Sequence, residues 1–197
     1  MRRTLITLSL PLALLAPVTA LQAAEPAPIA TTADASMALP FKQPREGLYT
    51  HGQPTAEQLA QAHAAGVTTV IDLRGEKEAR GYDEAATAQS LGLRYLSLPV
   101  AGGTGVTVEA ARQLHELLAT TDGPVLLHCA SGNRAGALLA LAAAHVDGAD
   151  NDSALALGRA AGLTSLAPIV EKQLPVPESA HREPANDSDD TGTAPRP

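Results

Sequence analysis

The sequence predicts an α/β domain in which a central, mostly parallel sheet lies between two layers of helices. Short runs of β-branched and aliphatic residues alternate along the chain with segments of helical periodicity. The run at residues 124–128 is continuously apolar, as is typical of a strand buried on both faces of a sheet. Parallel strands need crossover connections, and the helical segments between the runs would supply them.

Local signals delimit the elements. Thr55 and Gln58 form a capping box that begins a helix, and Gly66 ends it. Gly92 likewise ends the helix that follows Asp83. The predicted helices cover residues 55–65, 83–91, 108–119, 135–146, 153–161 and 164–174, and the predicted strands cover residues 67–73, 93–100 and 124–128.

The two ends of the chain differ from this alternating middle. Residues 1–24 combine two arginines, an apolar stretch too short to span a bilayer and small residues, which indicates a secretory signal peptide; an uncleaved anchor is the alternative. We therefore expect a periplasmic protein that does not contact the membrane once the signal is removed. Residues 25–45 read as a flexible linker, residues 46–174 as the folded domain, and residues 175–197 as a disordered, acidic, proline-rich tail.

Composition excludes some partners. The formal net charge is -7, so the chain lacks the positive surface that a nucleic acid would need. His63, His115 and His145 are isolated on helices without a partner at metal-ligand spacing, and neither a P-loop nor a dinucleotide fingerprint is present. We therefore expect no metal and no cofactor.

The single cysteine, Cys129, follows the strand at residues 124–128. The carboxyl ends of strands in open α/β sheets are where ligands bind. A lone cysteine cannot form an intramolecular disulfide, so Cys129 is either a small buried hydrophobe or a reactive thiol.

The residues after the cysteine favour the reactive thiol. A short glycine-containing loop that leads into a helix can direct successive backbone N–H groups towards an anion, and the helix dipole adds to this effect. Such a loop stabilises a thiolate. We expect the anion-binding loop to consist of Ala130, Ser131, Gly132 and Asn133, and Arg134 to clamp the anion with its guanidinium. The alternative is that Arg134 is an ordinary surface cation.

Three segments in this order resemble a known family. HGQPTAEQLAQAHAAGVTTVIDLR (51–74), LGLRYLSLPV (91–100) and PVLLHCASGNR (124–134) are similar to the phosphatase-like domain of the beta-lactamase-hydrolase-like proteins, within the protein-tyrosine-phosphatase superfamily. The resemblance covers about residues 45–165. It implies a cysteine-phosphatase-like fold, Cys129 as a nucleophile that forms a covalent intermediate, and Arg134 as the anion clamp.

The sequence departs from a working phosphatase in three ways. Arg134 stands five places after the cysteine instead of six, Ala135 replaces the usual Ser or Thr, and residues 93–121 contain no aspartate to protonate a leaving alcohol. Glu109 is a candidate acid, although a favourable dipole interaction in the first turn of a helix explains it without catalysis.

CASGNR also resembles the active loop of rhodanese-type sulfurtransferases, whose reaction needs no protonated alcohol. We therefore favour sulfur transfer through a cysteine persulfide, with phosphate ester hydrolysis and a non-catalytic anion- or partner-binding module as alternatives. The expected substrate is a small anionic or sulfur-containing molecule, or a phosphorylated one.

Further polar residues could support this site. His128 is expected on the opposite face of the strand from Cys129, where it would hydrogen-bond to the scaffold, or else tune the cysteine. A charged stretch after the strand at residues 67–73 either lines the pocket or forms a solvated loop; it contains Arg74, Glu76, Lys77, Glu78 and Arg80. The glycine-rich segment at residues 101–105 is a candidate flap or an ordinary wide turn.

Overall fold

The computed structural model describes residues 39–176. The predicted signal peptide, residues 25–38 of the predicted linker and residues 177–197 of the predicted tail lie outside this range. Five strands and six helices are present within it. The strands are β1 (Lys42–Arg45), β2 (Leu48–His51), β3 (Thr69–Asp72), β4 (Arg94–Ser97) and β5 (Val125–His128), and the helices are α1 (Ala56–Ala64), α2 (Glu84–Ser90), α3 (Val108–Ala119), α4 (Asn133–His145), α5 (Asn151–Ala161) and α6 (Ala167–Glu171).

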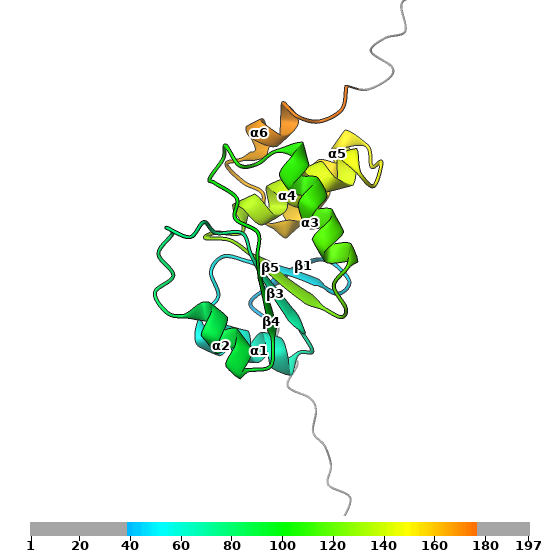
Figure 1. Cartoon of the computed structure of the whole chain (residues 1–197). Coiled ribbons are helices and arrows are strands. Elements are labelled where there is room, and N and C mark those ends of the chain that lie inside the picture. Colours follow the sequence, from blue (N-terminus) through cyan, green and yellow to red (C-terminus); the bar gives the residue numbers. More distant parts are fainter. Residues whose placement is uncertain (1–38, 177–197) are drawn as a thin grey trace, which may run out of the picture. The chain divides into compact units, whose positions relative to one another are not determined.

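The five strands form one sheet in the order β1-β2-β5-β3-β4 (Figure 1). β2, β5, β3 and β4 are parallel to their neighbours, and only β1 runs antiparallel, against β2. The predicted mostly parallel sheet is therefore confirmed. β5, which leads into the cysteine loop, lies in the middle, so that loop has neighbouring strand ends on both sides.

Helices cover both faces of the sheet, which gives the predicted three layers. α1 and α2 lie on one face, and α3, α4, α5 and α6 lie on the other (Figure 1). Two apolar clusters correspond to these faces. The α1/α2 face contains Leu59, Val70 and Leu126, and the α4 face contains Leu127 and Leu138. Successive residues of β5 alternate between the two clusters because side chains of a strand point to opposite faces.

Most of the predicted element boundaries hold. Thr55 caps α1 through a complete capping box, and Asp83 caps α2 by accepting the backbone N–H of Ala86. α3 covers the predicted residues 108–119. Three helices differ: α4 begins at Asn133 and α5 at Asn151, each two residues earlier than expected, and α6 is a five-residue helix instead of one spanning residues 164–174. The early start of α4 places Arg134 in its first turn.

The prediction of a flexible linker up to residue 45 is wrong for its last residues. Residues 42–45 form β1, which pairs with β2 across a turn at Gly47, where φ is +71°. Residues 42–51 show no clear alternation of apolar and polar side chains that would indicate this hairpin, and β1 contains Pro44. Proline removes one ladder donor but is tolerated on an edge strand such as β1. The domain therefore begins earlier than residue 46.

In the part of the chain that the structure describes, none of the helices combines the length and the hydropathy that crossing a bilayer requires.

Candidate active site

The carboxyl ends of four strands bring polar side chains into one row. His128 of β5 is in register with His51 of β2 on one side and with Asp72 of β3 on the other, and Asp72 is in register with Ser97 of β4. Residues in register across parallel strands share a face of the sheet. Cys129 is the next residue after His128 and therefore lies on the other side of this row.

The thiol of Cys129 is buried but hydrogen-bonded. The residue is 1% exposed, and its Sγ accepts the backbone N–H of Gly132 at 3.1 Å. Gly132 adopts φ +85°, a left-handed conformation that favours glycine, and this turn directs its N–H back to the sulfur. α4 begins at the next residue, so the loop leads into a helix N-terminus as predicted. Cys129 belongs to the apolar cluster on the α4 face, but the N–H of Gly132 gives its sulfur a polar contact that a thiol packed only among apolar groups would lack.

Arg134 is turned inward beside the cysteine. It is 7% exposed, and its Nη1 donates to the backbone carbonyl of Val100 at 2.7 Å. Nη1 and Nη2 also donate to the two carboxylate oxygens of Glu78, each at 2.6 Å. A largely buried guanidinium with these partners is not an ordinary surface cation, and the role of anion clamp expected of Arg134 stays a prediction.

Glu78 is the acidic partner of this arginine. The hydrogen bonds from Arg134 lower the pKa of Glu78, outweighing its partial burial, and the backbone N–H of Gly75 also donates to Oε1 at 2.9 Å. Glu78 in turn raises the pKa of Arg134, in spite of the burial of the guanidinium. The pair is therefore fully ionised at neutral pH, and Glu78 is not available as a proton donor.

The GQP segment supports the cysteine loop from one side. Gln53 donates its backbone N–H to the carbonyl of Ala130 at 3.2 Å. Gly52 lies so close that a Cβ there would be 3.0 Å from the carbonyl oxygen of Ala130 and 3.3 Å from the Cα of Ser131. This packing explains a glycine at position 52 without any direct role in chemistry.

Asn133 supports the loop from the other side. Its side chain accepts the backbone N–H of Thr164 at 2.8 Å and donates to the hydroxyl of Ser165 at 2.7 Å. Gly162, at φ +113°, packs against Gly132: a Cβ added to Gly162 would lie 3.1 Å from the carbonyl oxygen of Gly132. The role of Asn133 in the anion-binding loop concerns its backbone N–H and stays a prediction; its side chain fixes the segment after α5 to the loop.

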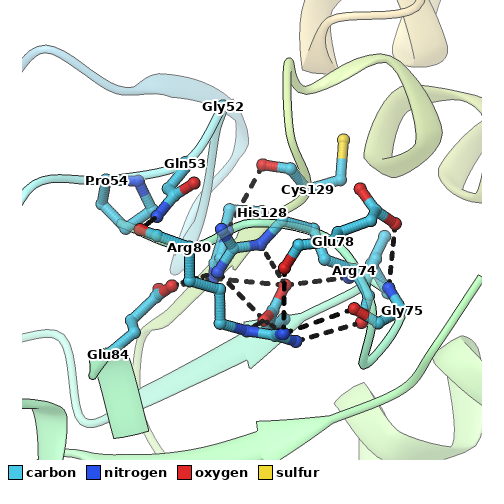
Figure 2. A network of polar contacts seen from close by, with 12 residues as sticks. Gly52, Gln53, Pro54, Arg74, Gly75, Glu78, Arg80, Glu84, His128 and Cys129 are labelled. Atoms are coloured by element: carbon cyan, nitrogen blue, oxygen red, sulfur yellow. Dashed lines mark hydrogen bonds and ion pairs between the residues drawn. The ribbon is translucent and has the colours of Figure 1, made fainter. Parts of the chain in front are cut away.

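A charged network lies below the strand ends, on the α1/α2 face. Asp72 accepts hydrogen bonds from Arg74 at 2.9 Å, from Arg80 at 3.1 Å and from the hydroxyl of Tyr95 at 2.7 Å. Burial alone would raise the pKa of Asp72, but the hydrogen bonds from Arg74 and the charges around it lower that pKa to about 2. Figure 2 shows the sulfur of Cys129 pointing away from Arg74, Arg80 and Glu84.

His128 belongs to this network and not to the thiol. Its Nε2 lies 2.8 Å from Oε1 of Glu84 and 3.8 Å from Oδ1 of Asp72, and all three side chains are fully buried. Arg74 is 1% exposed and forms ion pairs with both Asp72 and Glu84. The scaffold role expected for His128 fits these contacts. Arg74 does not line an open pocket; it neutralises the carboxylates beneath the site.

Asp72, Glu84 and His128 present ligand-type atoms within 4.8 Å of one another. A cation at their centre would meet the guanidinium of Arg74, which already pairs with both carboxylates. The charge of the cluster is therefore compensated by the protein itself, and we assign it a structural role.

Glu109 does not extend towards a neighbouring loop. It is exposed in the first turn of α3, where its Oε1 accepts a hydrogen bond from Gln113 on the same helix at 3.2 Å. This geometry fits the helix-dipole explanation of Glu109.

Sequence reasoning missed three partners of the buried charges: Glu78, which it treated only as one charge in a charged stretch, and Glu84 and Tyr95. The available signal was Asp72 at the end of a buried strand, because a buried aspartate needs partners and Arg74 and Arg80 follow closely.

Comparisons with known proteins agree with this geometry. A family model described as "DSP-PTPase phosphatase fused to NAD+ Kinase" matches residues 19–165. Among curated proteins, a beta-lactamase hydrolase-like protein from Xylella fastidiosa is 38% identical over 122 residues, which are 59% of this chain and 28% of that protein. A protein of the same description from Agrobacterium fabrum is 33% identical over 94 residues, covering 46% of this chain and 22% of that protein. The chain thus spans about a quarter of the length of these relatives.

Solved structures share the fold. A candidate phosphatase from Neisseria meningitidis has a TM-score of 0.58 at 22% identity, covering 66% of this chain and 94% of its own. A candidate phosphatase from Shewanella putrefaciens has a TM-score of 0.51 at 19% identity, covering 68% and 93%. These likenesses establish the cysteine-phosphatase-like architecture that the three sequence segments implied.

Proposed function

This chain belongs to the family described as DSP-PTPase phosphatase fused to NAD+ kinase, and we propose that it is a cysteine-dependent enzyme that transfers sulfur through a persulfide on Cys129. The scaffold is that of the cysteine phosphatases. The proposed sulfur transfer, unlike ester hydrolysis, does not require an acid that protonates the leaving group.

The absence of a placed proton donor is the observation that carries this proposal. Ester hydrolysis needs an acid to protonate the leaving alcohol, and losing it costs about 10² to 10⁴ in rate, or roughly 3 to 5 kcal/mol. The carboxyl group held beside Arg134 is Glu78, whose pKa is lowered by that arginine. The segment at residues 101–107 contains no carboxylic acid, and Glu109 interacts with its own helix. Among the described residues, these contacts therefore place neither Glu78 nor Glu109 as a protonated acid near the thiol.

Sulfur transfer does not need such a donor. The thiolate of Cys129 attacks the outer sulfur of thiosulfate, an S–S bond forms to Cys129, and the original S–S bond breaks with its electron pair leaving on sulfite. A nucleophile such as cyanide then attacks the outer sulfur of the persulfide, which releases thiocyanate and restores the thiolate. No proton is transferred in either step. The backbone N–H of Gly132, which donates to the sulfur, supports this proposal, and the guanidinium of Arg134 would add to the stabilisation of the negative sulfur.

Phosphate ester hydrolysis is the second candidate, and membership of a phosphatase family supports it. In that reaction the thiolate would attack phosphorus and expel an alcohol. Without a proton donor, aryl esters would react because a phenolate is a good leaving group, and alkyl esters would react far more slowly.

One comparison separates the candidates. The purified protein is supplied with thiosulfate and cyanide in one assay and with an aryl phosphate in the other, next to Cys129→Ser. We expect thiocyanate formation by the natural protein only, and a gain of one sulfur atom on the intact protein after thiosulfate alone. Because Cys129 is the only cysteine of the chain, an added sulfur atom would identify Cys129 as the residue that carries the persulfide. Hydrolysis of the aryl phosphate without thiocyanate would replace this proposal by the second candidate, and turnover of neither would leave an anion- or partner-binding module.

We also propose that residues 1–24 direct export and that the enzyme works in the periplasm on a small anionic, sulfur-containing or phosphorylated substrate. The support is the arginine pair followed by a short apolar stretch and small residues. Sequencing the N-terminus of protein recovered from the periplasmic fraction tests this proposal. Recovery of the full-length chain from the cytoplasm would contradict it.

A further inference from the structure

Residues 100–106 connect β4 to α3 and are called the β4–α3 turn below. Within this turn, the backbone N–H of Gly105 donates to the carbonyl of Ala101 at 2.8 Å, and the hydroxyl of Thr104 donates to the same carbonyl at 3.0 Å. A Cβ at Gly105 would lie 3.1 Å from that carbonyl oxygen, so the turn closes tightly on itself. Because these contacts join residues of the turn to one another, the turn would keep its shape if it moved.

The two ends of the β4–α3 turn are buried beside the thiol. Val100 and Val106 are each 2% exposed, and both belong to the apolar cluster on the α4 face that also contains Cys129. The sulfur points away from Arg74 and Glu84, as Figure 2 shows, and therefore lies on the side of this cluster. Because Cys129 is only 1% exposed, a substrate of either candidate reaction reaches the sulfur only when part of this covering moves.

α6 and the residues that follow it fasten the turn from outside. Nε2 of Gln173 donates to the carbonyl of Val106 at 2.9 Å. A Cβ at Gly103 would lie 2.9 Å from Cδ1 of Ile169 and 3.2 Å from Cδ2 of Leu166, so α6 packs directly against the middle of the turn. The outer side of the turn thus depends on one hydrogen bond and one apolar contact.

Gln173 is itself well supported. Nε2 of His145, the last residue of α4, lies 2.6 Å from the carbonyl oxygen of Gln173, and the backbone N–H of Gln173 donates to the carbonyl of Val170 at 2.8 Å. At the other end of α4, Nη1 of Arg134 donates to the carbonyl of Val100 at 2.7 Å. Both ends of the β4–α3 turn are therefore tied to α4, directly through Arg134 and indirectly through Gln173.

We propose that the β4–α3 turn is a lid over Cys129 and that Gln173 sets how often this lid opens. Opening breaks the hydrogen bond to Val106 and the contact of Gly103 with α6, while the sheet and the other helices stay folded. Segments held by few contacts open locally at a lower cost than the whole domain unfolds. The inference goes beyond the proposed function and does not depend on it, because a sulfur donor and a phosphate ester have to reach the same sulfur.

The rate at which iodoacetamide alkylates Cys129 measures this opening, because Cys129 is the only cysteine of the chain. The reaction is run at about pH 9, where the thiol also ionises in the unfolded chain. The natural protein is compared with Gln173→Ala and Ile169→Ala, which remove the hydrogen bond and the apolar contact separately. Gln113→Ala is the matched control, since it removes an exposed amide that donates to Glu109 within α3.

We expect alkylation to be about fivefold faster in Gln173→Ala, which is the effect of one lost hydrogen bond on an opening equilibrium. Ile169→Ala should also accelerate it, and Gln113→Ala should leave the rate unchanged. An unchanged rate in Gln173→Ala would overturn the proposal. Alkylation of the natural protein as fast as that of the urea-unfolded protein would overturn it as well, because no lid would then limit access.

Urea separates opening of the lid from unfolding of the domain, since the substitutions also remove stabilising contacts. Opening of a lid exposes little surface, so the alkylation rate should hardly change with urea well below the unfolding midpoint, whereas a rate that depends on global unfolding rises with the slope of the unfolding equilibrium. A rate with that steep slope in Gln173→Ala would assign the effect to the stability of the fold and overturn the lid. None of these measurements uses turnover, so failure of the thiosulfate assay would overturn the proposed function and leave this inference standing.

Discussion

Gly136 of α4 and Gly158 of α5 face each other where the two helices meet. A Cβ at Gly136 would lie 2.5 Å from the carbonyl oxygen of Gly158 and 2.3 Å from the backbone nitrogen of Leu163. A Cβ at Gly158 would lie 2.9 Å from the carbonyl oxygen of Gly136. The backbones of the two helices therefore touch, and this contact places the segment after α5 against the first turn of α4, where Arg134 lies.

Gly136→Ala should therefore destabilise the domain although alanine is the better helix former. Helix propensity favours the substitution by about 1 kcal/mol, whereas the collision with backbone atoms costs about 3 kcal/mol. We expect a net loss of about 2 kcal/mol in the free energy of unfolding, measured by urea denaturation. Gly75→Ala is the control, because its Cβ would meet only Glu78 Oε1 at 3.7 Å. An unchanged midpoint for Gly136→Ala would contradict the close approach.

Asn133→Ala should loosen the segment at residues 164–166. The substitution removes the acceptor of the Thr164 N–H and the donor to the Ser165 hydroxyl, and at about 1 kcal/mol for each hydrogen bond we expect a loss of about 1 to 2 kcal/mol. Ser165→Ala breaks only the second bond and should cost about half as much. Hydrogen exchange of the Thr164 amide provides the specific readout, and it should accelerate in Asn133→Ala but not in Ser165→Ala. Equal exchange rates of the Thr164 amide in the two variants would show that Asn133 does not hold the segment at residues 164–166 in place.

The stability of the domain should fall at acid pH because of Asp72. Its pKa is about 2 in the folded protein and 3.8 ordinarily, so the folded state favours the ionised form. The resulting stabilisation, about 2 kcal/mol, is fully present above the ordinary pKa and is lost as the pH falls from about 4 to about 2. We expect the free energy of unfolding, measured between pH 2 and pH 7, to decline in this window.

Tyr95→Phe makes that prediction specific. Loss of the hydroxyl that donates to Asp72 at 2.7 Å should lower stability at pH 7 by about 1 kcal/mol and reduce the decline between pH 4 and pH 2, because the pKa of Asp72 rises. Tyr82→Phe is the matched control: it loses a hydrogen bond of similar length, to the carbonyl of Pro54, outside the Asp72 network. Identical pH profiles for the two variants would contradict a special role for Asp72.

Sequence reasoning predicted the arrangement of the cysteine loop because that arrangement is local. Cys129, Gly132 and Arg134 lie within six consecutive residues, and a strand followed by a glycine-containing loop and a helix dictates their arrangement. The capping box of Thr55 and Gln58 likewise depends on residues three places apart. These signals predicted the helices, three of the four parallel strands (β2 was missed) and the position of the thiol at the carboxyl end of a strand.

What the sequence left out depends on contacts between distant segments. Glu78 and Arg134 are 56 residues apart, and Asn133 and Thr164 are 31 residues apart. Only the fold shows which of the charges after β3 turns towards the cysteine loop and which turn to the opposite face of the sheet. β1 was missed for a related reason: an edge strand with a proline derives its conformation from pairing with β2 and not from its own pattern.

The cysteine loop is supported by Gly52 and Gln53 near the start of the domain and by Gly162 and Thr164 near its end. A crossover between homologous genes that separates the cysteine loop from either of these flanking segments would therefore yield a working site only if the second gene encodes matching contact residues at the new junction.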